Sequence, residues 1–399
     1  MKIKFDHFKC LPGRIEFDCQ DEKNGCTEPE RIFFELDQEV LPENDAIACL
    51  IATLCGDAYD DIVLDLSVAK DLIAKIQKFT KAVVHAKESD DPCEKSMSAA
   101  DREKGKVILN FSGGGDSLAA KCLLPSDIEL VSIDFGTGFE RERNFFEQFH
   151  PHILRTNFRR LKMDRNSWTF MGAGAILYSK YLRASHYVFG TVLEATTWNF
   201  LPHLNKIGSG KVPPFSFMGL ESIRCITGLT EVGTTMVVCH YLPQLMDACL
   251  SSLSRPGTIK RKRKELLFEI VCSRYGRKAN FVSTPAPERK IPFGQNFLED
   301  FLCLYYLKHR GREAAQNIIS DIPEEALLLA GRLKLNFYER LHCAFLNESS
   351  FPDNQWRADY IKKAVAAGVL PYEEEDYREI RLVADFLNQY HNYYPSGMA

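Results

Sequence analysis

Residues 106–124, KVILNFSGGGDSLAAKCLL, constrain the fold more than any other stretch of the chain. Residues 107–111 form a mostly apolar run of strand length, and residues 117–124 contain helix-forming residues that end before Pro125. A strand must therefore become a helix within about six residues. The glycines at 113–115 allow positive φ angles and a backbone turn that directs N–H groups toward an anion. The stretch predicts a strand, a tight loop and a helix whose N-terminus binds an anion.

Asp116 indicates which kind of anion is bound. A carboxylate beside a phosphate-binding loop repels the phosphate unless a divalent cation bridges the two, so a metal–polyphosphate complex is expected. A P-loop requires G-x-x-x-x-G-K-[ST], and the lysine is missing here. The dinucleotide pattern G-x-G-x-x-G fails at its third glycine, where Leu118 stands. The alternative is a glycine-rich turn without a ligand.

The loop resembles the S-G-G-x-D-S signature of the PP-loop ATP pyrophosphatase superfamily, whose members are adenine nucleotide alpha-hydrolase-like. The matching residues are Ser112, Gly113, Gly114, Asp116 and Ser117. The resemblance implies a parallel, doubly wound α/β sheet. It also implies that residues 112–117, including Gly115, hold the pyrophosphate of ATP. Asp116 and Ser117 are further implied to take part in catalysis. In this superfamily the substrate is activated by adenylation.

A second element follows the strand expected at residues 128–134. The strand ends in Asp134-Phe135-Gly136, and Glu142 lies on the helix expected next. This pattern resembles the D-Y-G-x-x-x-x-x-E element of 7-cyano-7-deazaguanine synthases, PP-loop enzymes that convert a carboxylate to a nitrile with ATP and ammonia. The resemblance implies that Asp134, Phe135 and Gly136 hold adenine. Asp134 could equally cap the following helix.

A third element follows the strand expected at residues 187–190. Gly190, Thr191 and Glu194 form the pattern G-T-x-x-E, which resembles the G-T-x-x-x-D/E element of amide-forming PP-loop enzymes but is one residue shorter; in those enzymes the carboxylate helps to bind magnesium. Ligands of open α/β sheets lie at the carboxyl ends of the strands, so Asp116 and Glu194 are expected to converge on one Mg²⁺. The expected cofactors are thus ATP and Mg²⁺.

The apolar pattern predicts an α/β protein with several parts. An α+β module is expected at residues 1–86, a polar linker at 87–105, the PP-loop α/β domain at 106–280 and a helical region at 281–399. Within the last two parts, the pattern predicts a long loop at 195–218, a helix at 219–226, a strand at 234–239 and helices at 297–309, 324–346, 358–368 and 377–389.

The deazaguanine synthases carry a cysteine cluster that binds structural zinc, and this chain departs from that pattern. No cysteine lies between Cys249 and Cys272, and the C-H-x8-C spacing of Cys239, His240 and Cys249 matches no usual zinc motif. These cysteines are expected to be buried thiols. Zinc is therefore expected to be absent, with apolar burial of Leu266, Leu267, Phe268 and Ile270 in its place.

Five consecutive cations, Lys260–Lys264, form the strongest local charge of the chain. Such a run is usually a solvated helix surface, which is the expectation here. The alternative is that it attracts RNA, a nucleotide or a phosphorylated substrate. The net charge of −4 argues against strong bulk attraction to nucleic acid.

Cysteine usage and the amino-terminal residues indicate a compartment. The chain has 13 cysteines, an odd number, and its first residues, MKIKFDHFKC, contain no apolar signal segment. No stretch approaches the roughly 20 apolar residues of a membrane span. A cytoplasmic protein with reduced thiols and no membrane association is expected.

The leading functional hypothesis is an ATP-dependent synthase or ligase that adenylates a carbonyl or carboxylate and releases AMP and pyrophosphate. The resemblance favours a purine-like or carboxylate small molecule as substrate. Two alternatives stay open: a PP-loop enzyme that modifies tRNA, and a catalytically idle nucleotide-binding component of a multi-protein assembly, for example in antiviral defence. The oligomeric state and the acceptor are not indicated by the sequence.

Overall fold

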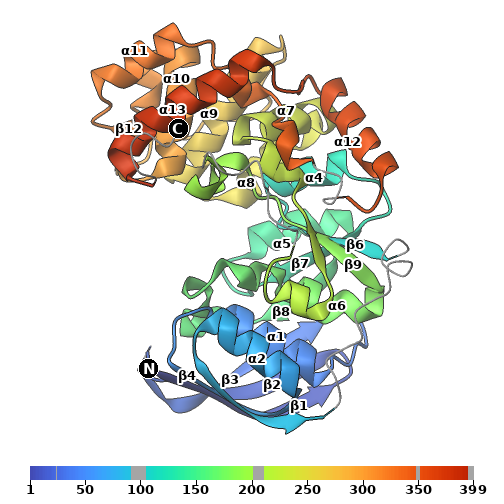
Figure 1. Ribbon diagram of the computed structural model, residues 1–399. Helices are drawn as coiled ribbons and strands as arrows, with labels where there is room; N and C mark the ends of the chain where they lie inside the picture. Colours follow the sequence, from blue (N-terminus) through green and yellow to red (C-terminus); the bar gives the residue numbers. More distant parts are fainter. Residues whose placement is uncertain (24, 91–104, 201–210, 347–350, 394–399) are drawn as a thin grey trace. The chain divides into compact units, whose positions relative to one another are not determined.

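The computed structural model describes residues 1–23, 25–90, 105–200, 211–346 and 351–393 (Figure 1). The chain divides into two compact units, each built from separate stretches. Unit 1 comprises residues 1–112, 127–188 and 210–223, and unit 2 comprises residues 113–126, 189–209 and 224–399. Most of the predicted linker 87–105, and residues 201–210 of the predicted loop, lie outside the described residues.

Unit 1 contains a ten-stranded sheet in the order β10-β9-β6-β7-β8-β3-β2-β1-β4-β5. Its strands are β1 Lys2–Leu11, β2 Arg14–Asp21, β3 Cys26–Leu36, β4 Asp61–Ala69, β5 Val83–Ser89, β6 Lys106–Asn110, β7 Glu129–Asp134, β8 His152–Thr156, β9 Ala184–Val188 and β10 Glu221–Ile223. In this order, the neighbouring strands from β10 through β9, β6 and β7 to β8 pair in parallel, and so do β1, β4 and β5. The three pairs between these groups, β8–β3, β3–β2 and β2–β1, are antiparallel. The predicted α/β class with a mostly parallel sheet is confirmed at this level.

The antiparallel pair β3–β8 joins the first strands of the chain to the strands that follow the glycine loop. Phe34 lies opposite Thr156, and Leu36 lies opposite Leu154. The rings of Phe34 and Phe158 stack with centroids 6.0 Å apart, which continues the core across this junction. The compact units therefore do not follow the predicted boundaries at residues 86, 105 and 280, because strands from both sides of the predicted linker pair in one sheet.

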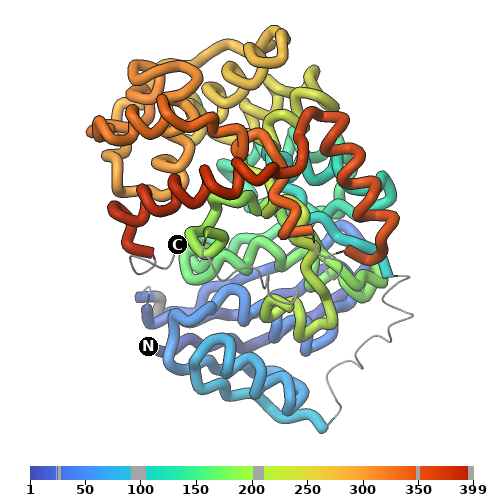
Figure 2. The backbone as a smooth tube through the Cα atoms, turned by 45° about the horizontal axis from the view of Figure 1, so that its top comes forward, coloured from blue at the N-terminus to red at the C-terminus, as the bar shows by residue number. Residues whose placement is uncertain are grey.

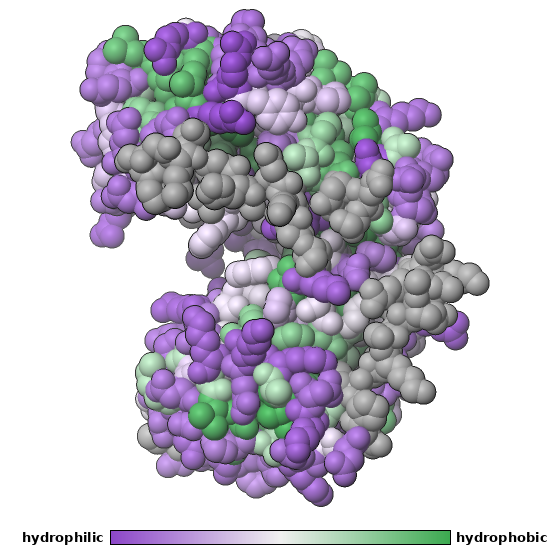
Figure 3. Space-filling view, in the orientation of Figure 1, coloured by the Kyte–Doolittle hydropathy of each residue, from purple (hydrophilic) through white to green (hydrophobic). Residues whose placement is uncertain are grey.

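Among the described residues of unit 1, the helices are α1 Asn44–Cys55, α2 Lys70–Thr80, α5 Glu140–Phe146 and α6 Ala173–Leu182. In Figure 2, α1 and α2 lie on one side of the blue strands. Residues 46–55 of α1 are all buried, and α1 contacts both α6 and β4. On the visible face of unit 1, hydrophobic residues lie among hydrophilic ones (Figure 3), as is usual for a protein surface.

Unit 2 is mostly helical. Its helices are α4 Gly115–Leu123, α7 Glu231–Tyr241, α8 Met246–Leu253, α9 Ile259–Arg274, α10 Phe297–Ala315, α11 Glu324–Arg332, α12 Asn354–Ala366 and α13 Glu374–His391, with a short two-stranded sheet of β11 Ile291–Pro292 and β12 Ile319–Ser320. Helix α13, red in Figure 2, packs against α10. Among the described residues, no helix combines the length and the apolar composition that would let it cross a membrane.

The prediction of a strand at residues 234–239 is wrong, because these residues belong to α7. The side chain of Thr230 accepts hydrogen bonds from Val232 N at 3.1 Å and Gly233 N at 3.3 Å, and so caps the helix. Every residue from Glu231 to Cys239 is buried. A helix that is buried on all sides has the same short apolar pattern as a buried strand, which explains the error.

Two predicted helices are also wrong. Residues 219–226 form β10 and a short 3₁₀ segment, Cys225–Gly228, instead of a helix. The helix predicted at 324–346 ends at Arg332. Beyond it, the carboxylate of Glu379 accepts hydrogen bonds from the backbone N–H groups of Lys334 and Leu335, each at 2.7 Å. These contacts hold Leu335 at a φ of 60°, which a continuing helix cannot adopt.

Candidate functional site

The glycine loop opens α4 as the sequence predicts. Gly113 has a φ of +73°, Gly114 is the extended residue before the helix, and Gly115 is the first helical residue. A Cβ atom at Gly115 would meet no atom within 4 Å, so the start of the helix faces open space. Ser117 is buried, and its hydroxyl donates to the carbonyl of Gly114 at 3.0 Å. The N-terminus of α4 therefore presents the positive end of a helix to that space.

Gly190 holds a second segment against the start of α4. A Cβ atom at this position would lie 2.8 Å from Ser117 N and 2.9 Å from the carbonyl carbon of Asp116. Only glycine permits so close an approach of two backbones. Unit 2 therefore contains the predicted residues Gly190 and Thr191 beside the predicted residues Asp116 and Ser117.

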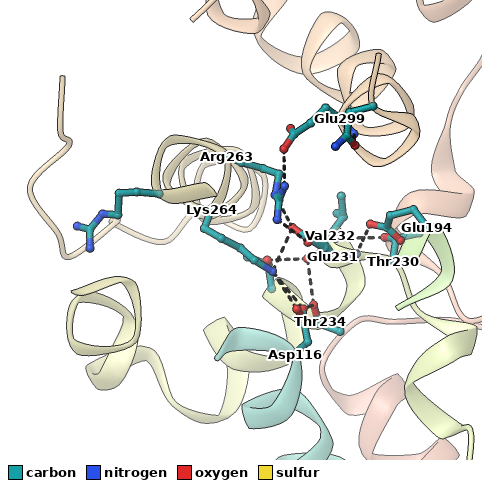
Figure 4. Close-up of polar contacts among 12 residues, drawn as sticks. Asp116, Glu194, Thr230, Glu231, Val232, Thr234, Arg263, Lys264 and Glu299 are labelled. Carbon is teal, nitrogen blue, oxygen red and sulfur yellow. Dashed lines mark hydrogen bonds and ion pairs between the residues drawn. The ribbon is translucent and has the colours of Figure 1, made fainter. Parts of the chain in front are cut away.

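Asp116 is held by two side chains from distant helices (Figure 4). Its Oδ1 accepts a hydrogen bond from Thr234 Oγ1 of α7 at 2.6 Å. Lys264 Nζ of α9 lies 3.1 Å from Oδ1 and 3.2 Å from Oδ2. Burial alone would lower the pKa of Lys264, but the charges of Asp116 and Glu231 raise it above its ordinary value. Lys264 is therefore a buried cation at the start of α4.

Glu231 links Lys264 to a second buried cation. Glu231 Oε2 lies 3.1 Å from Lys264 Nζ and 3.1 Å from Arg263 Nε, and its Oε1 lies 3.2 Å from Arg263 NH2. Arg263 also donates to Glu299 of α10. Burial would raise the pKa of Glu231, but Arg263 and Lys264 lower it. The pKa of Glu299 is raised, chiefly by burial.

The expectation that residues 260–264 form a solvated surface is therefore wrong. Only Lys260 of the five is exposed, while Arg261 and Lys264 are buried. Arg261 pairs with Glu265 at 2.6 Å, one turn later on α9. The expected burial of residues 266–268 and 270 is confirmed. Residues 261–264 of this run all pair with carboxylates of unit 2, and attraction of RNA by the run stays a prediction.

Glu194 is the second predicted magnesium ligand, and one of its oxygens has no hydrogen-bond partner. The residue is 1% exposed, and its Oε1 accepts a hydrogen bond from Glu231 N at 2.7 Å. Its Oε2 is buried without a partner among the described residues. Burial, followed by the nearby charge of Glu231, raises the pKa of Glu194 to about 8, and Asp116 adds to the shift. A buried carboxylate oxygen without a donor is a candidate ligand atom for a hard cation.

The charges of the buried ionisable side chains around Asp116 and Glu194 do not balance. We call Asp116, Glu194, Glu231, Arg263, Lys264 and Glu299 the buried cluster. If all six side chains were ionised, four carboxylates would face two cations, a net charge of −2. One divalent cation would neutralise the excess, as would protons on Glu194 and Glu299.

The raised pKa of Glu194 has a consequence for stability. The unfolded chain releases this proton near the ordinary pKa of 4.5, whereas the folded chain keeps it until about pH 8. The contribution of Glu194 to stability is thus complete below pH 4.5 and is lost as the pH rises toward 8. Without metal, we expect the free energy of unfolding of the wild type, relative to Glu194→Gln, to fall by about 3 kcal/mol between pH 5.5 and 8. Urea unfolding at both pH values tests this, and equal changes in the two proteins would contradict it.

The remaining predicted residues lie in unit 1. Ser112, Asp134, Phe135 and Gly136 belong to it, as does Glu142. Asp134 Oδ1 accepts a hydrogen bond from Gly136 N at 2.9 Å, and Oδ2 accepts one from Arg143 at 3.0 Å. Asp134 thus accepts a hydrogen bond within the turn that follows β7. Its part in adenine binding stays a prediction.

A group of two carboxylates and one imidazole in unit 1 could also hold a metal ion. Asp6, His7 and Asp18 have ligand atoms within 4.8 Å of one another in unit 1. Their carboxylates already pair with basic side chains, because Lys4 contacts Asp6 at 2.5 Å and Arg31 contacts Asp18 at 2.9 Å. These contacts account for the group as a surface ion-pair network.

The sequence did not identify Thr234, Glu231, Arg263, Lys264 or Glu299 as site residues. One signal was present: Thr230-Glu231 before a compact apolar run is a helix N-cap followed by an acidic first turn. For Arg263 and Lys264 no local signal separates a buried cation from a solvated one. Their burial depends on partners as far away as Asp116, 148 positions earlier than Lys264.

Relatedness to known proteins gives no independent support for the site. Comparisons with protein-family models, with curated proteins and with solved structures find no match to this chain.

Proposed function

We propose that unit 2 binds the polyphosphate of ATP with Mg²⁺ and that the protein is a PP-loop ATP pyrophosphatase that adenylates a carbonyl or carboxylate substrate. The observation that carries the proposal is Glu194 Oε2, a buried oxygen without a donor in the same cluster as Asp116. The N-terminus of α4 supports it, because a helix N-terminus attracts phosphate. The finer fold assignment, a doubly wound PP-loop sheet, is part of this proposal.

The donor set suits magnesium. Mg²⁺ prefers oxygen ligands and is usually held by one or two carboxylates together with substrate phosphates and water. Asp116 and Glu194 would supply the carboxylates. Bound there, the ion would neutralise phosphate charge and orient phosphate oxygens. Lys264 already neutralises Asp116, so that a phosphate approaching α4 meets a carboxylate paired with a cation.

The protein residues have defined roles in this reaction. The backbone of residues 113–117 would bind the phosphate oxygens, and Lys264 would attract the negative charge of the departing pyrophosphate. A substrate oxygen attacks the α-phosphorus, the bond to the β-phosphate oxygen breaks, and pyrophosphate leaves with both electrons of that bond. Ammonia or another nucleophile then displaces AMP from the adenylated substrate.

We expect the nucleotide products to be AMP and pyrophosphate, not ADP and phosphate. The chain lacks the P-loop lysine that accompanies transfer of a γ-phosphate. Incubation with Mg·ATP, ammonium and a panel of purine carboxylates, followed by anion-exchange chromatography, measures the products. Lys260→Met, which alters the exposed cation of the basic run, is the control and should behave as the wild type.

ADP as the main product would refute the proposed reaction. Binding of Mg·ATP without turnover on any panel member would favour the alternative of an idle nucleotide-binding component. No binding of Mg·ATP would refute the site itself.

A further inference from the structure

Three sulfur atoms meet inside unit 2, two turns of α7 beyond Glu231 and thus outside the buried cluster. They belong to Cys239 of α7, Met246 of α8 and Cys272 of α9. Cys239 Sγ lies 3.7 Å from Met246 Sδ, Cys272 Sγ lies 3.9 Å from Met246 Sδ, and the two thiol sulfurs are 3.9 Å apart. All three side chains are buried, with exposed fractions of 3%, 2% and 1%.

The three distances make a nearly equilateral triangle. The point equidistant from the three sulfurs lies about 2.2 Å from each of them. A metal–thiolate bond has almost this length, roughly 2.3 Å for zinc. An ion could therefore bind in the plane of the triangle with little movement of the side chains.

The ligand chemistry selects the ion. Two thiolates and a thioether are soft ligands, which favour Cu(I) among biological cations. Structural zinc requires four protein ligands in a tetrahedron, whereas this group of sulfur atoms offers three. The set also differs from the Cys239, His240 and Cys249 combination considered from the sequence, since Met246 and Cys272 take the places of His240 and Cys249.

The surroundings provide charge compensation and access. Two thiolates with one Cu(I) carry a net charge of −1, and Arg277 lies beside them, donating to the carbonyl oxygen of Cys239. Cys272 and Arg277 both line an open surface pocket of 580 Å³, through which a carrier could deliver the ion by ligand exchange.

We propose that Cys239, Met246 and Cys272 form a binding site for one Cu(I) ion. On binding, the two thiols release their protons to solvent and form two thiolate–copper bonds, and the thioether adds a third bond. No electron is transferred, because the ion enters as Cu(I). The site ties α7 to α8 and α9, and it neither needs nor excludes nucleotide binding.

The test uses the full chain, reduced and free of oxygen. Cu(I) is titrated in competition with a chromogenic Cu(I) chelator, and X-ray absorption at the copper edge measures the ligands. We expect one Cu(I) per chain and three sulfur neighbours at about 2.2 Å. Met246→Leu, which preserves volume, should weaken binding at least tenfold, and Cys272→Ala should abolish it. Met163→Leu and Cys303→Ala, at buried sulfurs elsewhere, are the matched controls and should bind as the wild type.

Several outcomes would overturn the proposal. They are no binding by the wild type, nitrogen or oxygen neighbours in its absorption spectrum, tighter binding of Zn(II) than of Cu(I), and unchanged binding in both variants. The first would show that the sulfurs only pack against one another. The wild-type spectrum decides the matter by itself if the variants fail to fold.

Discussion

The Asp116→Asn variant should bind Mg·ATP at least about 100-fold more weakly than the wild type, a loss of roughly 2.7 kcal/mol. Its neutral amide is a much weaker ligand for magnesium than a carboxylate and cannot neutralise Lys264, whose Nζ lies 3.1 Å and 3.2 Å from the two carboxylate oxygens. Isothermal titration calorimetry with Mg·ATP measures the loss. Glu231 still pairs with Lys264 in the variant, so the fold should persist.

A titration with ATP in EDTA separates a metal-bridging role from a merely structural one. Without metal, the carboxylate of Asp116 repels the phosphates, so the variant should bind ATP as well as the wild type or better. Thr234→Val removes the hydroxyl that donates to Asp116 but leaves the carboxylate, and it should cost far less affinity for Mg·ATP. Equal weakening of Asp116→Asn with and without magnesium would contradict the assignment of Asp116 as a metal ligand.

The Arg263→Met variant should lose roughly 3–5 kcal/mol of unfolding free energy. Arg263 is the cation between Glu231 and Glu299, which are 4% and 2% exposed at their side chains. Methionine has a similar length but leaves both carboxylates without this partner in a buried place. Urea unfolding at neutral pH, followed by circular dichroism, measures the change.

Lys260→Met is the matched control for this experiment. Lys260 belongs to the same run of cations but is exposed, and its substitution should change stability by less than about 0.5 kcal/mol. The double variant Arg263→Met with Glu299→Gln should recover part of the loss, because it removes the charge of Glu299, one of the two carboxylates that lose Arg263 as a partner. Equal stability of the Arg263 and Lys260 variants would show that the buried cluster does not hold unit 2 together.

The elements of the fold that depend on a few neighbouring residues could be predicted from the sequence. The strand, the three glycines and the following helix at residues 106–124 were predicted within one or two residues of β6 and α4, because glycine, capping and helix-forming residues all act over a few positions. The parallel neighbour β7 was predicted for the same reason. By contrast, the pairing of β3 with β8 joins residues such as Glu35 and Arg155, which are 120 positions apart. The sequence of neither strand identifies the other as its partner.

Burial of charge could not be predicted from the sequence. Arg263 and Lys264 are ordinary members of a basic run until Glu231, Glu299 and Asp116 are brought to them by packing. The helix α7 was missed because burial on all sides removes the polar face by which a helix is usually identified. Glu194 was found from a motif, but its unpaired oxygen is a property of the folded chain.

Helix α4 is covered by residues that are synthesised much later. At its end, Lys363 of α12 donates a hydrogen bond to the carbonyl of Leu124 at 2.6 Å, across 239 positions of sequence. A ribosome that adds about 5–20 residues per second needs roughly 10–50 s to make the intervening chain. During that time α4, whose residues Leu118, Ala119 and Leu123 are buried in the finished protein, lacks its contacts with α12. The glycine loop is thus translated early, but it can reach its native surroundings only after about 240 further residues have left the ribosome.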